Sequence, residues 1–472
     1  MPAPCLTESA ARLAASAREG TASVTGMIDR LLDRIDRLND KTKAYISVDG
    51  EGARDAARRC ERREIAGPLA GVPYAAKDLF ETRRLPTTGG SRVLEGWQSD
   101  RDAAAIERLN AAGAILIGKA NLHEFAHGTT GENARFGTPP NPWGPGRMAG
   151  GSSSGSAVAV AQGLACFALG SDTGGSTRVP AALCGLVGLK PTYGRVSRDG
   201  MIPYCWSLDH VGLIAGCVGD AALVLQSLAG HDPRDSGSAE WVVPDYAKAL
   251  TRGVKGLRIG VPERHFFEHA DPEILAATRR CLARLAERGA TLLPVTLPDL
   301  AQARTVSLLL QMPEVLSYHR RYLPEKMALY GEDVRSGLAF AQFILAEHYV
   351  RAQRMLEKYL RETEAALAGV DAIVTPTCPI VAPRLGTVAV ATDGLEEPVG
   401  NALTRFTSFF NMTGAPAMSV PSGLHSTGLP MGVQIVGRPF DEETVLAIGQ
   451  AVEDRQGLLL DPAAGCCDGA AI

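Results

Sequence analysis

Hydrophobic residues recur along the chain at two spacings, which predict helices and short strands. Apolar positions follow helical spacing over 23–38, and the polar, arginine-rich stretch that continues to Glu64 predicts a second helix. From Gly67 onward, short apolar runs alternate with amphipathic segments. Strands are expected at 72–76, 114–118, 165–170, 257–261, 291–295, 372–375, 418–420 and 432–436. Helices are expected between some of them, at 101–112, 155–163 and 272–288.

This alternation predicts an α/β fold with a mixed, mostly parallel central sheet covered by helices on both faces. Residues 302–366 carry many charges and are expected to be mostly helical. We expect residues 1–65 to form an N-terminal helical segment packed on the core. Residues 66–460 are expected to form a single domain, and the Ala/Gly-rich residues 461–472 a flexible tail.

Composition narrows the possible functions. The chain has 472 residues, of which 45% are hydrophobic, and this is ample for a large core. The net charge is -4 and no Lys/Arg block stands out, so nothing in the charge pattern indicates binding to nucleic acid or to an anionic membrane. The sequence contains neither a signal peptide pattern nor an apolar run of membrane-spanning length, and we expect a cytoplasmic protein. The 10 cysteines include no Cys-x-x-Cys pair and are expected to be buried free thiols.

Two Gly/Ser-rich loops, at 150–156 and 170–178, enclose an apolar helix and strand. Flexible linkers are the weaker interpretation, because linkers are polar throughout and these loops lie between elements that look buried. Gly/Ser loops at element ends gather backbone N–H groups in one concavity and present hydroxyls with little steric cover. Such an arrangement is typical of a site that holds an oxyanion.

A serine hydroxyl needs a base before it can attack a carbonyl at neutral pH. Lys77 follows the apolar run 72–76, and lysine is rarely buried without a reason. Burial would disfavour its charge and lower its pKa toward neutrality. The structural alternative is an ion pair between Lys77 and Asp78 or another acid. Either His123 or His127 could reach a site, but packing or substrate contact is the preferred interpretation for both.

Several strings of residues, in the same order, resemble the amidase signature family. They are Gly71-Val72-Pro73, Lys77-Asp78, Gly150-Gly151-Ser152-Ser153, the segment 170–178, Gly185-Leu186-Val187-Gly188-Leu189-Lys190-Pro191-Thr192, Asp209-His210-Val211-Gly212 and Gly428-Leu429-Pro430-Met431-Gly432-Val433-Gln434. The resemblance covers roughly residues 25–455 and is densest over 67–214. It is specific because several long strings match in order, whereas one Gly/Ser loop alone would be weak.

The resemblance implies that the protein is an amidohydrolase with a Ser–Ser–Lys triad. Ser176 would attack the carboxamide carbonyl and carry the acyl group, Ser152 would relay the proton, and a neutral Lys77 would accept it. The bond between Gly151 and Ser152 would be cis. The product is a carboxylate, and the leaving group is ammonia or an amine.

The surroundings of the triad are also implied by the resemblance. The oxyanion hole matches the backbone around Thr173, Gly174 and Gly175, together with Ser176 itself. The substrate-side segment matches His127, Gly128, Thr129, Thr130 and Gly131. Asp172 and Arg178 are interpreted as an ion-paired brace under the nucleophile loop. No metal or organic cofactor is expected, and a homodimer is possible.

A competing interpretation comes from Gly151-Ser152-Ser153-Ser154-Gly155, which satisfies the nucleophile-elbow pattern of α/β-hydrolases. It would make Ser153 the nucleophile. The elbow needs a strand directly before it, and the Gly/Pro-broken run 143–150 is a poor candidate for a buried strand.

A second alternative lies inside the family, as the glutaminase subunit of a tRNA-dependent amidotransferase. Such subunits place an arginine where this chain has Ser336 or Gly337, and an aspartate where it has Thr404 or Arg405. Because neither is present, we expect a stand-alone amidase that acts on a small-molecule amide, without nucleic acid or membrane. A non-catalytic scaffold is a third class, against which the presence of all three triad residues argues. The identity of the amide stays open.

Overall fold

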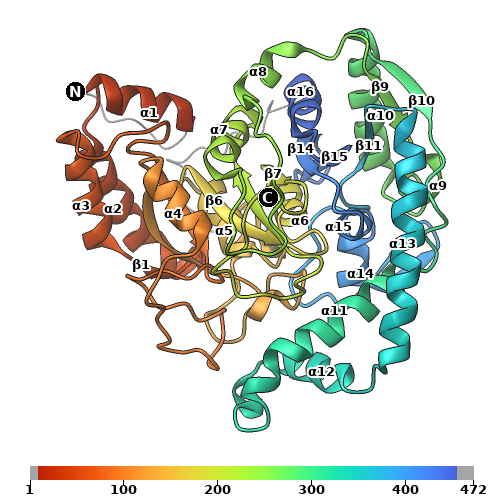
Figure 1. The fold of residues 1–472 in the computed structure, drawn as a ribbon, viewed down its shortest axis with the longest axis horizontal. Helices are drawn as coiled ribbons and strands as arrows, with labels where there is room; N and C mark the ends of the chain where they lie inside the picture. Colours follow the sequence, from red (N-terminus) through yellow and green to blue (C-terminus); the bar gives the residue numbers. More distant parts are fainter. Residues whose placement is uncertain (1–8, 454–472) are drawn as a thin grey trace.

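An 11-stranded mixed sheet runs through the molecule. The computed structural model describes residues 9–453 (Figure 1), so the tail expected at 461–472 lies outside them. The strand order is β1-β3-β2-β6-β8-β7-β14-β15-β11-β9-β10. These strands are β1 (Tyr45–Val48), β2 (Pro73–Lys77), β3 (Ile115–Ala120), β6 (Phe167–Asp172), β7 (Val187–Lys190), β8 (His210–Ala215), β9 (Arg258–Val261), β10 (Thr291–Pro294), β11 (Ala372–Pro376), β14 (Ala417–Leu424) and β15 (Pro430–Gly437).

Parallel pairing forms two blocks in this sheet. β2 pairs in parallel with β3 and β6, and β9 pairs in parallel with β10 and β11. The strands between the blocks, from β6 through β8, β7, β14 and β15 to β11, pair antiparallel, and β1 adds antiparallel to β3. The predicted mixed α/β sheet is therefore confirmed. Two hairpins lie outside it: β4 (Pro140–Asn141) with β5 (Gly144–Met148), and β12 (Ala389–Thr392) with β13 (Leu395–Pro398).

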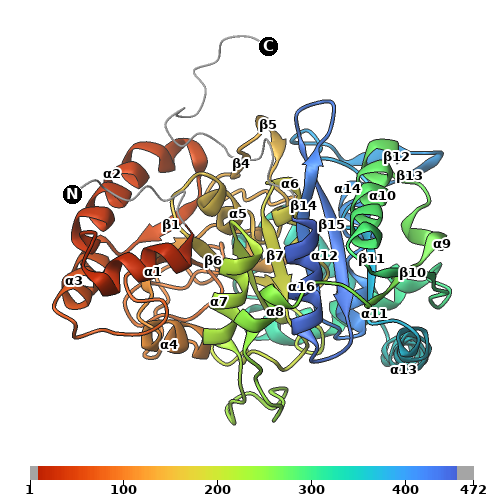
Figure 2. The same cartoon turned by 90° about the horizontal axis from the view of Figure 1, so that it is seen from above.

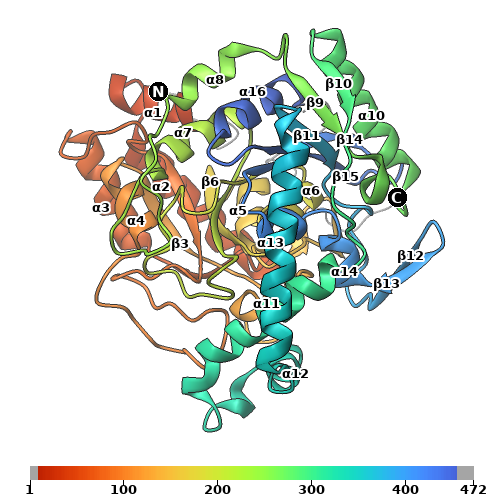
Figure 3. The same ribbon diagram turned by 45° about the vertical axis from the view of Figure 1, so that its right-hand side comes forward.

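Helices surround the sheet (Figures 1 and 2). They are α1 (Ala10–Glu19), α2 (Val24–Thr42), α3 (Gly50–Glu61), α4 (Ala104–Ala111), α5 (Ser154–Ala161), α6 (Arg178–Leu183), α7 (Val218–Leu228), α8 (Tyr246–Arg252), α9 (Glu263–Phe266), α10 (Pro272–Glu287), α11 (Ala303–His319), α12 (Glu332–Ala341), α13 (Ala346–Ala368), α14 (Val399–Thr404), α15 (Phe409–Met412) and α16 (Glu442–Val452), with 3-10 turns at Glu124–Ala126, Arg320–Tyr322 and Met327–Leu329. Figure 1 shows the long α13 on the side opposite α1–α3, and Figure 3 shows it running across the front of the molecule.

The helices cover both faces of the sheet, as β14 illustrates. Successive side chains of a strand point to opposite faces. A Cβ added at Gly449 of α16 would lie 2.1 Å from Met418 Cε, so α16 packs on the Met418 face. A Cβ added at Gly432 of β15 would lie 2.8 Å from Ala182 of α6 and 2.9 Å from Ser419 Oγ, so α6 packs on the Ser419 face.

The predicted elements correspond closely to those observed. The helix expected at 23–38 is α2, and the region expected to be helical at 302–366 contains α11, α12 and α13. Three strands of the central sheet, β1, β7 and β8, were not predicted. The division into an N-terminal segment and a single domain stays a prediction. None of the helices within residues 9–453 has the length and apolar character needed to cross a membrane. Most of the cysteines of this part of the chain are buried.

Candidate active site

Lys77 is the last residue of β2, and it is completely buried. β2 lies between β3 and β6, and all of its residues are buried, which accounts for the apolar run before Lys77. Because β2 and β6 are parallel, their carboxyl ends lie at the same edge of the sheet. Lys77 therefore lies beside the last residues of β6, which are Ser171 and Asp172.

The amine of Lys77 contacts two serine hydroxyls. Its Nζ lies 2.6 Å from Ser152 Oγ and 2.8 Å from Ser171 Oγ. Burial lowers the pKa of Lys77 to about 7, although the carboxylates of Asp172 and Asp209 oppose part of that fall. At neutral pH a substantial fraction of this amine is therefore uncharged while it lies in hydrogen-bonding contact with Ser152.

The structural alternative for Lys77, an ion pair with its neighbour Asp78, is not what is observed. Asp78 forms a buried ion pair with Lys119, at 2.8 Å, and also accepts hydrogen bonds from the backbone N–H and hydroxyl of Thr88. Within residues 9–453, no carboxylate lies within ion-pair distance of the Lys77 amine. Lys119 thus neutralises the charge of Asp78, and the Lys77 amine contacts the serine hydroxyls instead.

The two Gly/Ser loops lie against each other. The N–H of Ser153 donates to the carbonyl of Ser176 at 3.3 Å. The bond between Gly151 and Ser152 is cis, as the resemblance implied. Ser152 is completely buried, whereas Ser176 keeps 5% of its surface exposed. The structure therefore brings Lys77, Ser152 and the Ser176 loop together at one edge of the sheet.

Asp172 and Arg178 form the predicted buried brace under the second loop. Arg178 Nη2 lies 2.8 Å from Asp172 Oδ1, and both side chains are inaccessible to solvent. Burial alone would raise the pKa of Asp172, but the Arg178 guanidinium holds it well below its usual range. Asn411 donates to Asp172 at 2.9 Å, and Arg178 donates to Gln434 at 2.7 Å. The brace thus ties the loop to segments more than 200 residues away.

The same brace defines which N–H groups remain for an oxyanion. The N–H of Gly175 donates to Asp172 Oδ1 at 2.8 Å, so this predicted oxyanion donor is already occupied. In the described part of the chain, the N–H groups of Gly174 and Ser176 have no acceptor. Gly175 has φ 130°, and an added Cβ would lie 2.2 Å from Thr407 Oγ1, so only glycine fits. The hydroxyl of Thr407 in turn donates to the Gly174 carbonyl at 2.7 Å.

Thr173 is held by Asp209, a contact that the sequence did not indicate. Thr173 Oγ1 donates to Asp209 Oδ1 at 2.5 Å, and Asp209 also accepts from the backbone N–H groups of Tyr204 and Cys205. Burial raises the pKa of Asp209 to about 6, although these hydrogen bonds oppose the rise. Asp209 therefore connects the predicted oxyanion segment to the loop that contains Tyr204.

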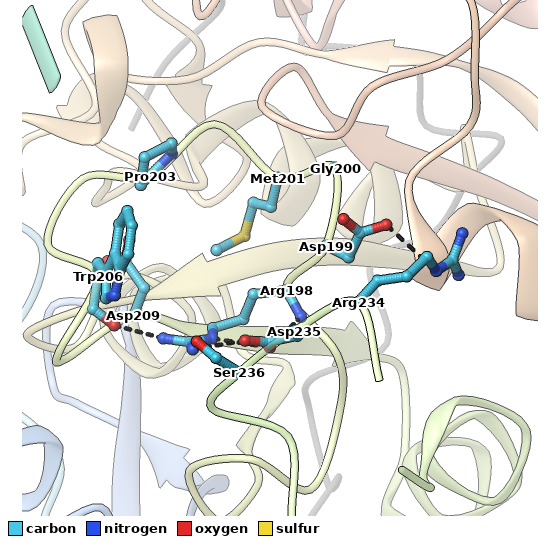
Figure 4. Close-up of a pocket in the computed structure, with 10 residues that line it drawn as sticks. All are labelled: Arg198, Asp199, Gly200, Met201, Pro203, Trp206, Asp209, Arg234, Asp235 and Ser236. Carbon is cyan, nitrogen blue, oxygen red and sulfur yellow. Dashed lines mark hydrogen bonds and ion pairs between the residues drawn. The ribbon is translucent and has the colours of Figure 1, made fainter. Parts of the chain in front are cut away.

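Asp209 also lines a pocket of about 290 Å³ (Figure 4). Arg198 pairs with Asp235 in this pocket, at 2.8 Å, and Arg234 pairs with Asp199, at 3.5 Å. Each of its arginines is thus matched by a carboxylate. The lining residues are Arg198, Asp199, Gly200, Met201, Pro203, Trp206, Asp209, Arg234, Asp235 and Ser236.

The predicted substrate-side segment lies beside the first Gly/Ser loop. The carbonyl of Thr129 accepts from the N–H of Gly151 at 2.7 Å. A Cβ added at Gly131 would lie 2.6 Å from the carbonyl oxygen of Gly150. The hydroxyl of Thr129 donates to the Gly400 carbonyl at 3.4 Å, which connects this segment to α14. Gly128 and Thr130 lie against the His123 ring.

The two histidines differ in their contacts. His123 pairs with Asp333 of α12 at 2.6 Å. His127 packs against α12, since a Cβ added at Gly337 would lie 2.1 Å from its Nε2. Its ring centroid lies 5.7 Å from that of Tyr204. Gly337, one of the two positions at which amidotransferase subunits are expected to carry an arginine, is therefore in contact with the predicted substrate-side segment.

The nucleophile-elbow interpretation finds no support in the geometry. The run 143–150 does contain a strand, β5, but β5 pairs with β4 outside the central sheet, and only Met148 in it is buried. The hydroxyl of Ser153 is buried and donates to the Ser171 carbonyl at 3.3 Å. Ser153 therefore holds the two Gly/Ser loops together by hydrogen bonds.

Comparison with known proteins identifies the family. Residues 27–446 match the Amidase family. The chain belongs to this family. The amidase is 40% identical, over 476 residues, to a glutamyl-tRNA(Gln) amidotransferase subunit from Chloroflexus aggregans, and the match covers 95% of this chain and 96% of the relative. Amidase family membership makes the protein an enzyme that acts on carbon–nitrogen bonds.

Two solved structures that resemble the chain come from proteins with different names. A protein complex that reveals the evolutionary origins of an s-triazine catabolic enzyme contains a chain similar to this amidase, with a TM-score of 0.90, 33% identity, and coverage of 94% of this chain and 98% of that chain. A glutamyl-tRNA(Gln) amidotransferase subunit from Thermotoga maritima has a TM-score of 0.78, 34% identity, and coverage of 91% of each chain.

These relatives correct one expectation. We expected a small-molecule amide as the partner, with no nucleic acid. The relatives that share about 40% of their residues with the amidase are named as subunits, and their names include glutamyl-tRNA. The expectation failed because net charge describes the whole surface, whereas a protein that works within a complex need not carry a basic face of its own.

Proposed function

We propose that this amidase is the glutaminase subunit of a tRNA-dependent amidotransferase, and that it releases ammonia from the side-chain amide of glutamine. The observation that carries the proposal is the contact of 2.6 Å between the Lys77 amine and Ser152, next to the Ser176 loop. The names of the relatives supply the choice of glutamine and tRNA. This reverses the order of preference drawn from the residues at 336–337 and 404–405.

The proposed chemistry begins on Ser176. Its hydroxyl attacks the amide carbonyl, and its proton passes through the Ser152 hydroxyl to the neutral amine of Lys77. The negative charge on the carbonyl oxygen is held by backbone N–H groups of Thr173, Gly174 and Ser176. Each such donor typically stabilises the transition state by about 3 kcal/mol.

Collapse of this intermediate breaks the carbon–nitrogen bond. The proton returns from Lys77 through Ser152 to the leaving nitrogen, which departs as ammonia, and an acyl-enzyme ester remains on Ser176. Water then attacks the ester by the same relay and releases the carboxylate. A role for the segment from His127 to Gly131 in substrate contact, and a cytoplasmic location, stay predictions.

The experiment is an assay of ammonia release from glutamine, with and without the partner subunits of an amidotransferase and glutamyl-tRNA(Gln). Glutamine-dependent conversion of the glutamyl-tRNA is expected, and Ser176→Ala should abolish it. Absence of glutamine hydrolysis under every one of these conditions would overturn the proposal.

A second candidate is hydrolysis of a different carboxamide. It is favoured by the TM-score to the s-triazine-related chain, which is 0.90, against 0.78 for the Thermotoga maritima subunit. It is also favoured by Gly337, because the His127 ring occupies the space that a side chain at this position would need. A panel of amides followed by ammonia release separates the two candidates.

A further inference from the structure

Arg304, near the start of α11, is a cation without a counter-charge in direct contact. Its Nε donates to the neutral side chain of Asn401 at 3.0 Å. Across residues 9–453, its Nη1 and Nη2 atoms make no hydrogen bond, and no carboxylate lies within 4 Å. The carboxylate of Glu397 favours the charged form of Arg304 and so raises its pKa, but Glu397 itself forms an ion pair with Arg405 at 3.0 Å. Burial lowers the pKa of Arg304, because the charged form is poorly solvated there.

The face of α11 that carries Arg304 leads to the predicted oxyanion segment. Residues seven apart lie on one side of a helix, two turns along. Gln311 follows Arg304 at this spacing, and a Cβ added at Gly174 would lie 4.0 Å from Gln311 Nε2. Ser307, on the intervening turn, holds Gln311 by a hydrogen bond of 2.7 Å. Arg304 thus begins a row of polar side chains that ends beside Gly174.

Two further segments are linked to Arg304. Tyr204 is buried, which raises its pKa, and the charge of Arg304 opposes part of that rise. The Tyr204 ring is also the neighbour of His127. Asn401, the hydrogen-bond acceptor of Arg304, follows Gly400, whose carbonyl accepts from the Thr129 hydroxyl. Arg304 therefore contacts α14 directly, through Asn401, lies within electrostatic range of Tyr204, and is connected through α14 to the substrate-side segment.

A guanidinium in this setting is suited to one class of ligand. It is planar, always charged, and presents its N–H groups in a fork that matches the two oxygens of a carboxylate. Part of this fork is occupied by a neutral amide, and the remainder has no protein partner in residues 9–453. A cation left unpaired in a partly buried site is unfavourable until an anion binds.

We propose that Arg304 binds a carboxylate of the substrate, so that the amide hydrolysed at Ser176 carries a carboxylate group away from the scissile bond. This rests on the proposed function in one respect, that Ser176 is where the amide reacts. Glutamine belongs to the class, since it bears an α-carboxylate. Uncharged amides of the same size do not.

The test compares succinamate with succinamide, which differ only in a carboxylate against a carboxamide. The wild-type enzyme should favour succinamate in kcat/KM. Arg304→Gln should raise the KM for succinamate by about 10- to 100-fold, the usual range for one charged hydrogen-bond pair, with a much smaller change for succinamide. Arg304→Lys should restore part of the preference, because it restores the charge without the fork.

Arg320→Gln is the matched control, since Arg320 directly follows the same helix and is exposed. It should leave both substrates unchanged. Equal losses for succinamate and succinamide in Arg304→Gln would assign the residue a structural role and overturn the proposal. So would a wild-type enzyme that does not distinguish the two compounds.

A binding measurement separates this proposal from the proposed function. In a Ser176→Ala background, calorimetry with succinamate and succinamide should show the same preference and its loss on Arg304→Gln. If Ser176→Ala still hydrolyses amides, the proposed function fails whatever Arg304 does. If Ser176→Ala is inactive and binds both compounds equally, only the role of Arg304 fails.

Discussion

The two sides of the candidate site are built differently. At the sheet edge, Lys77, Ser152, Asp172 and Arg178 have no exposed surface, and each is hydrogen-bonded within the core. The helical region α11–α13 leaves large apolar side chains exposed, among them Phe340, at 59%, and Phe343, just beyond α12, at 78%. A densely bonded edge fixes the position of reacting groups. The open helical side can change its residues with little effect on the fold, and it is therefore where differences in substrate are expected.

The largest effect is expected from Ser176→Ala, at the sheet edge. Loss of the proposed nucleophile should lower kcat by at least about 10,000-fold, because the proposed relay then has no group to activate. Circular dichroism and the unfolding midpoint should stay near those of the wild type. Turnover that is close to normal would remove Ser176 from the proposed chemistry.

Lys77→Met should lower kcat by about 1,000-fold, since the relay loses its proton acceptor while the methionine fills the same buried space. Steady-state rates at pH 8 measure this. The variant should also be more stable than the wild type at pH 7. The pKa of Lys77 falls from 10.5 to about 7 on folding, so the unfolded chain binds more protons between these values.

The burial of Lys77 therefore opposes folding most at and below pH 7, by about 5 kcal/mol, and this opposition fades as the pH approaches 10.5. The stability advantage of Lys77→Met in urea unfolding should shrink between pH 7 and pH 10. A constant advantage across that range would contradict the depressed pKa.

Arg178→Met tests the rigidity of the sheet edge. It leaves Asp172 buried without its cation, which should lower the free energy of unfolding by about 3–5 kcal/mol. Activity should fall as well, because the Gly175 N–H and the loop depend on Asp172. Replacing Asp172 with asparagine in the same variant removes the uncompensated charge and should recover part of the stability.

The pH dependence of kcat/KM should follow the amine at the sheet edge. In the proposed chemistry the uncharged form of Lys77 is the active one, so the rate should rise about tenfold per pH unit below a midpoint of about 7 and level off above it. A profile that falls through pH 7 would assign the essential group the opposite protonation state.

Phe343→Ser, on the open side, should have the smallest effect. The side chain has little packing to lose, so the free energy of unfolding should change by less than about 0.5 kcal/mol. Chemical denaturation of this variant beside Arg178→Met measures the contrast directly. A loss as large as that of Arg178→Met would show that the helical side is not the permissive one.

Much of the framework follows from sequence patterns, and the exceptions have a physical cause. β8 was not predicted because Gly212 interrupts it, yet this glycine is not a turn residue. A Cβ there would lie 2.1 Å from Thr177 Oγ1, so the strand needs glycine to admit the loop of the nucleophile. Gly188 in β7 has the same origin, since a Cβ there would lie 2.6 Å from Ala181 Cβ. Glycine selected by close packing is indistinguishable, in one sequence, from glycine selected by a turn.

The candidate site likewise contains residues that the sequence predicts and residues that it does not. Lys77, Ser152 and Ser176 lie in recognisable strings, and the structure places them together. Gln311 and Arg304 lie in a helix whose residues follow no motif, and Asp209 contacts Thr173 only because the chain folds back. Such contacts depend on three-dimensional approach, for which a local pattern carries no signal.

The brace on the second loop has a consequence for how the enzyme is made. Asp172 and Arg178 emerge early in translation, but two of their partners, Asn411 and Gln434, are synthesised more than 200 residues later. A nascent chain on the ribosome therefore carries Lys77, Ser152 and Ser176 before the contacts that brace the Ser176 loop can form. In the proposed chemistry, hydrolytic competence is therefore expected only after the final strands dock, and an incomplete polypeptide should not release ammonia.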